Sequence, residues 1–286
     1  MTKDRDGNLW FGTDGAGVCC VDSIWNIRTT LSTKSGANAL RQNNIKALAY
    51  HPGSNRLFIG THLGGLSVYD IGTGTTTNMI DNQRLAQELG NVIHSLKVRG
   101  DNLFIASRTG LSRLDLTTDS IHHIATPTPP LFIDFDSDGN LYYFHQRGRR
   151  IYRVAHPEES SPEVVPLPRL LGNGAPSSFC CTDSGLLVST IGDGIISFPG
   201  YGDTQIQYNT SNSALPDDYC YTIANGPDGS VYILTEHNVV RMKPDADMER
   251  VKFNDYFPDS HIIDDCALLP LQSGDILVGR NKGITR

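Results

Sequence analysis

The sequence predicts an all-β fold: a seven-bladed β-propeller of four-stranded antiparallel blades, with incomplete first and last blades. Two observations support this prediction. A turn of Asp, Asn or Gly followed by a short apolar strand occurs seven times in the 286 residues. The equivalent apolar positions of the copies lie 38 to 48 residues apart, and a four-stranded propeller blade needs a period of about 45. These positions are Leu9, Leu57, Leu103, Leu141, Leu186, Val231 and Ile276.

The composition fits a turn-rich globular chain. Gly contributes 28 residues and Pro 15, hydrophobic residues make up 38% and charged residues 19%, which excludes a disordered chain. The net charge is −7 and the sequence has no block of Lys or Arg, so we expect no nucleic acid partner. No apolar run approaches the roughly 20 residues of a membrane helix, so we expect no direct membrane insertion.

Each repeat has the same order of features. The turn reverses the chain, because Asp, Asn and Gly tolerate positive φ angles. The apolar strand then ends in a small residue, such as Gly12 or Gly60, and a glycine-containing loop leads to the next strand. Another apolar run precedes the turn, and a polar stretch forms the outer edge strand. Only residues 83–89 have helical periodicity. The repeat cores lie at residues 6–22, 55–70, 101–115, 138–154, 184–198, 228–242 and 273–286.

The two terminal repeats do not complement each other. The first starts at its second strand, and the seventh ends after residues 283–286. A propeller normally closes by sharing one blade between its two ends, because open sheet edges aggregate. We therefore expect residues 1–286 to form one propeller domain that is a fragment of a longer sensor protein.

The first repeat resembles a known family. Residues 6–13, Asp-Gly-Asn-Leu-Trp-Phe-Gly-Thr, are followed by Gly17 and by a strand that ends in Asp22. This pattern resembles the two-component-regulator propeller repeat, and residues 212–219 resemble the linker of that family into a new blade. The resemblance implies the sensor domain of a hybrid two-component system histidine kinase/response regulator. It also implies a periplasmic location, as part of an inner-membrane sensor.

The same resemblance implies partners and a role. Sensors of this family commonly recognise oligosaccharides and regulate polysaccharide utilisation, so a small carbohydrate is the expected ligand. An adjacent propeller or a β-sandwich of the same longer chain is the expected neighbour, with a homodimer formed through that longer protein. We expect this chain to be no enzyme and to need no cofactor or metal.

The stretches that resemble catalytic or metal-binding motifs each lack an essential part of the motif. Residues 12–17 are glycine-rich but lack the Lys-Ser/Thr pair of a phosphate loop. Residues 136–140 lack the spacing of an EF-hand and predict a hairpin turn. His122 and His123 are adjacent and would face opposite sides of a strand. The sequence has no Cys-x-x-Cys spacing, and its six cysteines are interpreted as buried small side chains: Cys19, Cys20, Cys180, Cys181, Cys220 and Cys266.

The best candidates for binding lie in two sets of loops. We call the loop between the second and third strands of a blade its glycine loop, and the loop before its first strand its lead-in loop. In a propeller both sets gather at one mouth of the central channel. The lead-in loops supply Arg41, Asn43, Asn44, Asp217, Asp218, Asp259 and His261. The candidate ligand-binding residues of the glycine loops are His62, Arg108, His145, Arg147, Glu236, His237 and Arg280.

These residue types predict a surface that hydrogen-bonds sugar hydroxyls or pairs with an acidic sugar through Arg. Two alternatives stay open: a propeller enzyme of the polysaccharide lyase or hydrolase type, and an interaction scaffold without a ligand. The mixed signs of the charges argue weakly against an enzyme. Trp10 is expected in the core between blades. Trp25 is either a sugar-stacking platform or an edge residue.

Overall fold

The computed structural model describes residues 1–145, 149–251, 267–280 and 283–286, with the side chain of Arg280 left out. The described residues form seven antiparallel sheets, and the fold class is the predicted seven-bladed β-propeller. Two compact units can be described separately. Unit 1 comprises Met1–Ile133 and Pro157–Pro162, and unit 2 comprises Asp134–His156 and Glu163–Arg286. The boundary between the units therefore falls inside a strand of the fourth sheet.

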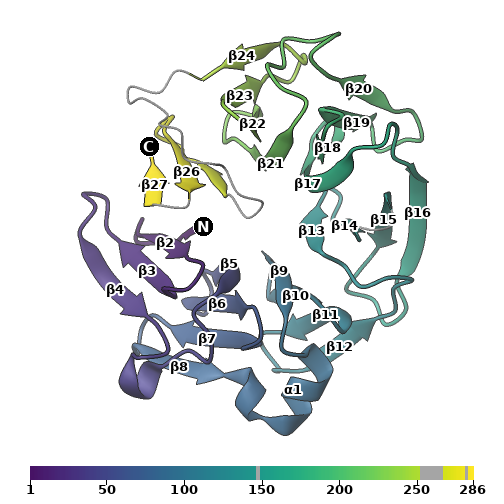
Figure 1. Ribbon diagram of the computed structural model, residues 1–286. Coiled ribbons are helices and arrows are strands. Elements are labelled where there is room, and N and C mark those ends of the chain that lie inside the picture. The colour runs from purple at the N-terminus through teal and green to yellow at the C-terminus, as the bar shows by residue number, and fades with distance from the viewer. Residues whose placement is uncertain (146–148, 252–266, 281–282) are drawn as a thin grey trace. The chain divides into compact units, whose positions relative to one another are not determined.

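Unit 1 contains the first three sheets, each a meander of four strands (Figure 1). The first has β1 (Thr2–Lys3), β2 (Leu9–Gly12), β3 (Val18–Val21) and β4 (Ile27–Leu31). The second has β5 (Ile45–His51), β6 (Arg56–Thr61), β7 (Leu66–Asp70) and β8 (Thr75–Asn78). The third has β9 (Ile93–Arg99), β10 (Asn102–Ser107), β11 (Gly110–Asp115) and β12 (Ile121–Ile124).

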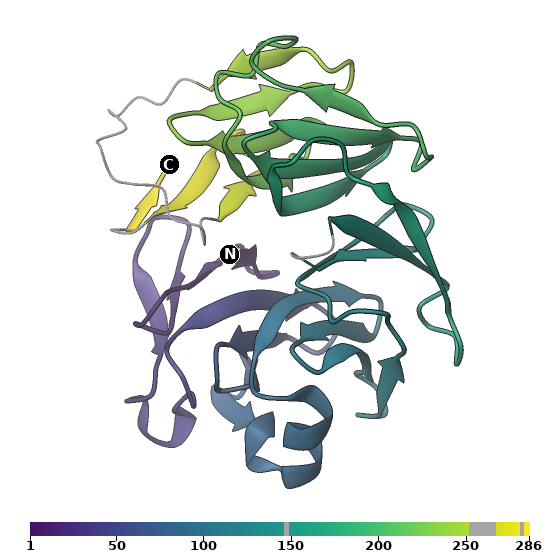
Figure 2. The ribbon, with the colours of Figure 1, turned by 45° about the vertical axis from the view of Figure 1, so that its right-hand side comes forward.

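Unit 1 also holds the short helices of the described chain. The 3-10 helices are η1 (Gly36–Asn38) and η2 (Met79–Asp81), and the α-helix is α1 (Gln83–Leu89). Helix α1 is the segment for which the sequence predicted helical periodicity. It begins where the Asn82 side chain accepts hydrogen bonds from the amides of Arg84 and Leu85, an N-cap that satisfies two otherwise unpaired donors. Figure 2 shows α1 as a blue coil outside the strands of the second sheet.

The remaining four sheets follow in chain order. The fourth has β13 (Phe132–Phe135), β14 (Leu141–Phe144), β15 (Arg150–Ala155) and β16 (Glu163–Arg169). The fifth has β17 (Ala175–Thr182), β18 (Gly185–Ile191), β19 (Ile195–Pro199) and β20 (Ile206–Tyr208). The sixth has β21 (Cys220–Asn225), β22 (Val231–Thr235), β23 (Val239–Met242) and β24 (Met248–Arg250). The seventh has β25 (Leu268–Pro270), β26 (Ile276–Arg280) and β27 (Gly283–Thr285).

The first blade corrects one sequence prediction. We expected it to lack its first strand, but β1 pairs antiparallel with β2, with Thr2 opposite Trp10 and Lys3 opposite Leu9. The first sheet therefore has four strands. A two-residue strand leaves no periodic pattern in the sequence, which is why the repeat seemed to begin later. The seventh sheet has three strands among the described residues, in the order β25-β26-β27.

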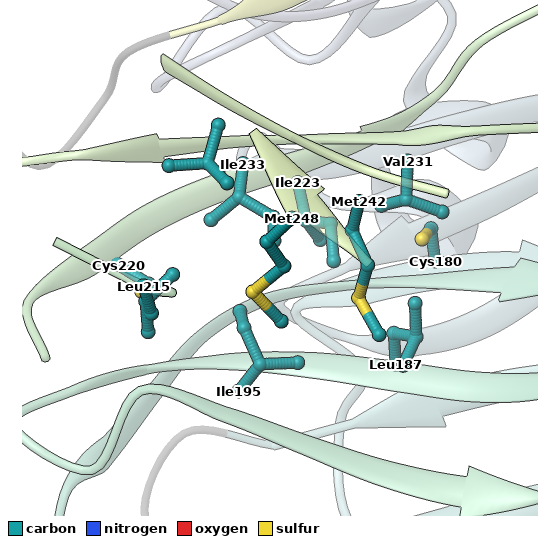
Figure 3. Close-up of a cluster of buried hydrophobic side chains, with 11 residues drawn as sticks. Cys180, Leu187, Ile195, Leu215, Cys220, Ile223, Val231, Ile233, Met242 and Met248 are labelled. Carbon is teal, nitrogen blue, oxygen red and sulfur yellow. The ribbon is translucent and has the colours of Figure 1, made fainter. Parts of the chain in front are cut away.

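The core of each unit lies between neighbouring sheets. Second strands such as β6 and β22 are buried along almost their whole length, because neighbouring sheets of the same unit cover both of their faces. In unit 2, Met242 and Met248 of the sixth sheet point toward Leu187 and Ile195 of the fifth (Figure 3). Methionine side chains are flexible enough to fill such irregular gaps.

Aspartate side chains close several of the predicted turns. In the turn before β14, Asp136 accepts hydrogen bonds from the amide and the side chain of Asn140, both at 2.8 Å. Asp4 does the same for Asn8 before β2. The carboxylate thus supplies the acceptor that the reversing backbone needs. This confirms the hairpin turn that the sequence predicted at residues 136–140.

A third such turn gives a prediction about acid titration. Asp115 accepts hydrogen bonds from the hydroxyl of Thr117 at 2.7 Å and from the amides of Thr117 and Thr118 at 2.8 and 3.1 Å. The Thr117 hydroxyl, and after it these amides, lower the pKa of Asp115 to about 2. Because the folded pKa is depressed, the contribution of Asp115 to stability is present above its unfolded pKa of about 3.9 and is lost as the pH falls toward 2.

We expect NMR titration of the Asp115 carboxyl group to show a midpoint near pH 2, and Thr117→Val to move this midpoint upward. Thr118→Val is the matched control, because Thr118 acts mainly through its amide, which the substitution keeps. Equal midpoints in the wild type and in Thr117→Val would contradict this assignment.

Candidate ligand-binding loops

Hydrogen bonds join the glycine loops of unit 1 to its lead-in loops. In the glycine loop of the first blade, the amides of Gly15 and Gly17 donate to the Asn43 carbonyl at 3.2 and 3.0 Å. The neighbouring Asn44 carbonyl accepts from the amide of His62, in the glycine loop of the second blade, at 3.0 Å. The lead-in loop is therefore held between two glycine loops. This confirms within unit 1 that the two sets of loops lie at one edge.

Two of the predicted binding residues belong to this edge. The amide of Arg108 donates to the Val92 carbonyl at 3.0 Å, and His62 pairs with Val92 in an isolated bridge. The side chains of His62 and Arg108 are exposed. Neither forms an ion pair with any residue that the structure describes. Backbone bonds thus position both residues while their polar groups stay available to a ligand.

Arg41 of the second lead-in loop pairs with a carboxylate that the sequence did not suggest. Its guanidinium forms a bidentate ion pair with Asp81 of η2, at 2.8 and 2.6 Å. The pair lines a shallow polar groove of about 590 Å³, together with Thr76 and Asn78 of β8. Sequence reasoning missed this pairing because Asp81 lies 40 residues beyond Arg41, in a segment outside the repeat pattern.

The same joining of loops occurs in unit 2. The amides of Gly192 and Gly194 in the glycine loop of the fifth blade both donate to the Asp218 carbonyl at 3.0 Å. Ile191 and Tyr219 form an isolated bridge beside them. The lead-in loop of the sixth blade, which contains Asp217 and Asp218, is therefore fixed by the preceding blade.

Two of the predicted binding residues, Glu236 and His237, lie close to Asp217 of this lead-in loop. Glu236 and His237 follow β22, and one ligand atom from each lies within 4.8 Å of the other and of a carboxylate oxygen of Asp217. His237 Nδ1 lies 3.5 Å from Asp217 Oδ2. Glu236 and His237 are exposed, whereas Asp217 is half-buried. Sequence reasoning placed Asp217 in a lead-in loop at the same mouth but did not predict this grouping with Glu236 and His237.

Among the residues that the structure describes, none of the remaining predicted binding residues is grouped with another. His145 follows β14 and is half-buried. Arg147, Asp259 and His261 lie outside the described residues, and so does the side chain of Arg280, although its backbone ends β26. The structure therefore brings together His62 with Arg108 in unit 1, and Glu236 with His237 in unit 2.

The tryptophans and cysteines can also be placed. Trp10 is buried and packs against Tyr69 of the second sheet, as predicted for a core residue. Trp25 is 39% exposed, and its ring stacks on Phe11 with centroids 6.3 Å apart. Four cysteines are buried, Cys19 is half-buried, and none of these five forms a disulfide. Cys266 lies outside the described residues. In the described part of the chain, no helix is long and apolar enough to span a membrane.

The meanders of antiparallel strands and their joined loops define a β-propeller protein. The family model of the two component regulator propeller matches residues 1–15, which comprise β1, β2 and the start of the first glycine loop. Residues 1–15 are therefore similar to the repeat that the sequence predicted for the first blade. No curated protein matches the chain.

Solved structures share this fold. The extracellular domain of a protein described as a one component system from B. thetaiotaomicron has a TM-score of 0.72 and 15% identity, over 99% of this chain and 37% of that chain. A streptogramin B lyase has a TM-score of 0.68 and 14% identity, over 99% and 90%. The virginiamycin B lyase from Staphylococcus aureus has a TM-score of 0.69 and 13% identity, over 99% and 91%. At these identities the likeness concerns the fold. The chain thus spans about a third of the B. thetaiotaomicron domain and most of each lyase.

Proposed function

We propose that this propeller is the ligand-sensing module of a two-component signalling protein. Its ligand is an oligosaccharide, whose capture regulates polysaccharide utilisation. The two component regulator propeller repeat at residues 1–15 supports the signalling class. The fold likeness to an extracellular domain from B. thetaiotaomicron supports a place outside the cytoplasm, and we assign the module to the periplasm.

The observation that carries this proposal is that residues of the glycine loops have a backbone fixed by hydrogen bonds and a polar side chain exposed to solvent. His62 and Arg108 hold their backbones through hydrogen bonds to the lead-in loops, so binding orders little of the loop. An exposed guanidinium offers several donors in a plane, which suits sugar hydroxyls and the carboxylate of an acidic sugar. In unit 2, the Glu236 carboxylate adds a hydrogen-bond acceptor, and the His237 imidazole can donate or accept.

The proposal includes the wider protein. The sensor module transmits binding as a rigid-body change to an adjacent propeller or β-sandwich of the same longer chain. The homodimer that signals is formed through that longer protein. The test is whether isolated residues 1–286 bind a sugar and whether a longer chain responds to it.

We expect Arg108→Ala to weaken oligosaccharide binding about tenfold or more, because a hydrogen bond to a charged group contributes about 1.5–3 kcal/mol. The measurement is a thermal-shift screen of neutral and acidic oligosaccharides, followed by calorimetric titration of each sugar that raises the melting temperature. Arg28→Ala is the matched control, because Arg28 is exposed near the start of β4, whereas only the other end of that strand, at Leu31, adjoins a glycine loop. Unchanged affinity in Arg108→Ala and His62→Ala would reject these loops as the binding site.

An enzyme is the second candidate. Asp217, Glu236 and His237 are the residue types of general acid and base catalysis, and their proximity favours this alternative. The fold likeness to two lyases is compatible with it. Prolonged incubation of the protein with each bound sugar distinguishes the candidates, since a sensor returns the sugar intact and a lyase or hydrolase forms product.

A further inference from the structure

Three ligand-type side chains of the sixth blade converge from two loops. Asp217 comes from the lead-in loop before β21, and Glu236 and His237 come from the turn between β22 and β23. One donor atom of each lies within 4.8 Å of the other two. In the part of the chain that the structure describes, no other three His, Cys, Asp or Glu side chains meet in this way.

The spacing between His237 and Asp217 suits a shared ion. His237 Nδ1 and Asp217 Oδ2 are 3.5 Å apart, which is longer than an ordinary hydrogen bond of about 2.7–3.2 Å. Two ligands of a tetrahedral zinc ion, each bonded at about 2.0–2.1 Å, lie about 3.3 Å apart. The two side chains are therefore spaced like neighbouring ligands of one ion.

The local charge also favours a cation. Asp217 and Glu236 bring two carboxylates together, and no Lys or Arg among the described residues forms an ion pair with either. A divalent ion would neutralise charge that no Lys or Arg of the described residues compensates.

The backbone under all three residues is fixed. The amide of Thr235 donates to the Asn238 carbonyl at 2.8 Å, and the Thr235 hydroxyl accepts from the Asn238 amide at 3.2 Å, which closes the turn that carries Glu236 and His237. The Asp218 carbonyl holds the other loop through Gly192 and Gly194. Only the exposed side chains of Glu236 and His237 need to rotate to complete a site.

We propose that Asp217, Glu236 and His237 bind one divalent transition-metal ion of the zinc type. An imidazole with two carboxylates suits zinc and disfavours magnesium and calcium, which prefer oxygen ligands alone. Three protein ligands leave the fourth position of a tetrahedral site open to water or to an oxygen of a bound molecule. The metal site goes beyond the proposed function, because it needs no carbohydrate.

The test is calorimetric titration of the chelator-treated chain with ZnCl₂. We expect one zinc ion per chain, and no comparable binding of Mg²⁺ or Ca²⁺. His237→Ala and Asp217→Asn should each weaken zinc binding about tenfold or more, since even residues behind the ligands contribute about 10–100-fold. Titration with Co²⁺ should produce the visible absorption bands of a tetrahedral ion, and these bands should disappear in His237→Ala.

The matched control is His122→Ala, which removes another exposed histidine, in β12 of unit 1. Melting temperatures without metal show that each variant is folded, and His237→Gln replaces His237→Ala if the latter is not. Zinc binding that His237→Ala and Asp217→Asn leave unchanged, or no zinc binding at all, would overturn the proposal and leave an ordinary ion pair. Sugar titrations in the presence of chelator test the carbohydrate proposal separately, so either can fail alone.

Discussion

Replacement of Trp10 by alanine is expected to lower the free energy of unfolding by about 3–5 kcal/mol, the usual cost of removing a large buried aromatic side chain. Trp10 is 2% exposed and packs in one cluster with Leu57 and Ile59 of the second sheet. Its indole Nε1 also donates to Asp4 Oδ2 at 2.8 Å. The substitution therefore opens a cavity between two sheets and removes a hydrogen bond from a buried carboxylate.

The chain contains its own control for this experiment. Trp25 is the second tryptophan, is 39% exposed, and its ring stacks on Phe11. Trp25→Ala should cost about 1 kcal/mol or less, because most exposed substitutions have small effects. Both variants can be measured by denaturant unfolding followed by circular dichroism. Equal losses in the two variants would show that Trp10 does not anchor the packing of the first sheet on the second.

Alanine at Gly194 is expected to cost about 2–5 kcal/mol. The φ angle of Gly194 is +72°, in the left-handed region that costs other residues about 1–2 kcal/mol. A Cβ atom here would also overlap the carbonyl oxygen of Tyr208 in β20, and such overpacking costs about 1–3 kcal/mol more. Because the Gly194 amide holds the Asp218 carbonyl, the substitution should also disturb the lead-in loop of the sixth blade.

Gly192 in the same loop separates the two effects. Its φ angle is also positive, at +104°, but a Cβ atom there would have no neighbour within 4 Å. Gly192→Ala should therefore show only the backbone cost of about 1–2 kcal/mol. Denaturant midpoints of the two variants give the comparison. If Gly192→Ala were as destabilising as Gly194→Ala, the close approach to β20 could not be the reason for glycine at this position.

The period of the sequence predicted the fold class and the edge that holds the loops. Each blade is a local meander, so turn residues and alternating apolar strands report it directly. Helix α1, the core position of Trp10 and the turn at Asp136 were predicted for the same reason: each depends on residues within one repeat or on its period. The joining of the loops at Asn44 and at Asp218 follows from that repeated geometry.

Contacts that depend on the packing of separate segments could not be predicted from the sequence. Strand β1 was missed because two residues, Thr2 and Lys3, carry no periodicity and become a strand only through pairing with β2. The ion pair of Arg41 with Asp81 depends on where η2 packs. These features require the tertiary structure because pairing register and side-chain direction are set by packing and not by local pattern.

The candidate site shows the same division. The sequence by itself determined that seven blades recur and that their glycine loops carry His62, Arg108, Glu236 and His237. Only the tertiary structure decided that Asp217, separated from His237 by a complete hairpin strand pair, turns its carboxylate to within 3.5 Å of that imidazole. A repeat pattern specifies the path of the backbone, whereas the meeting of three ligand atoms depends on how two loops of one blade pack together.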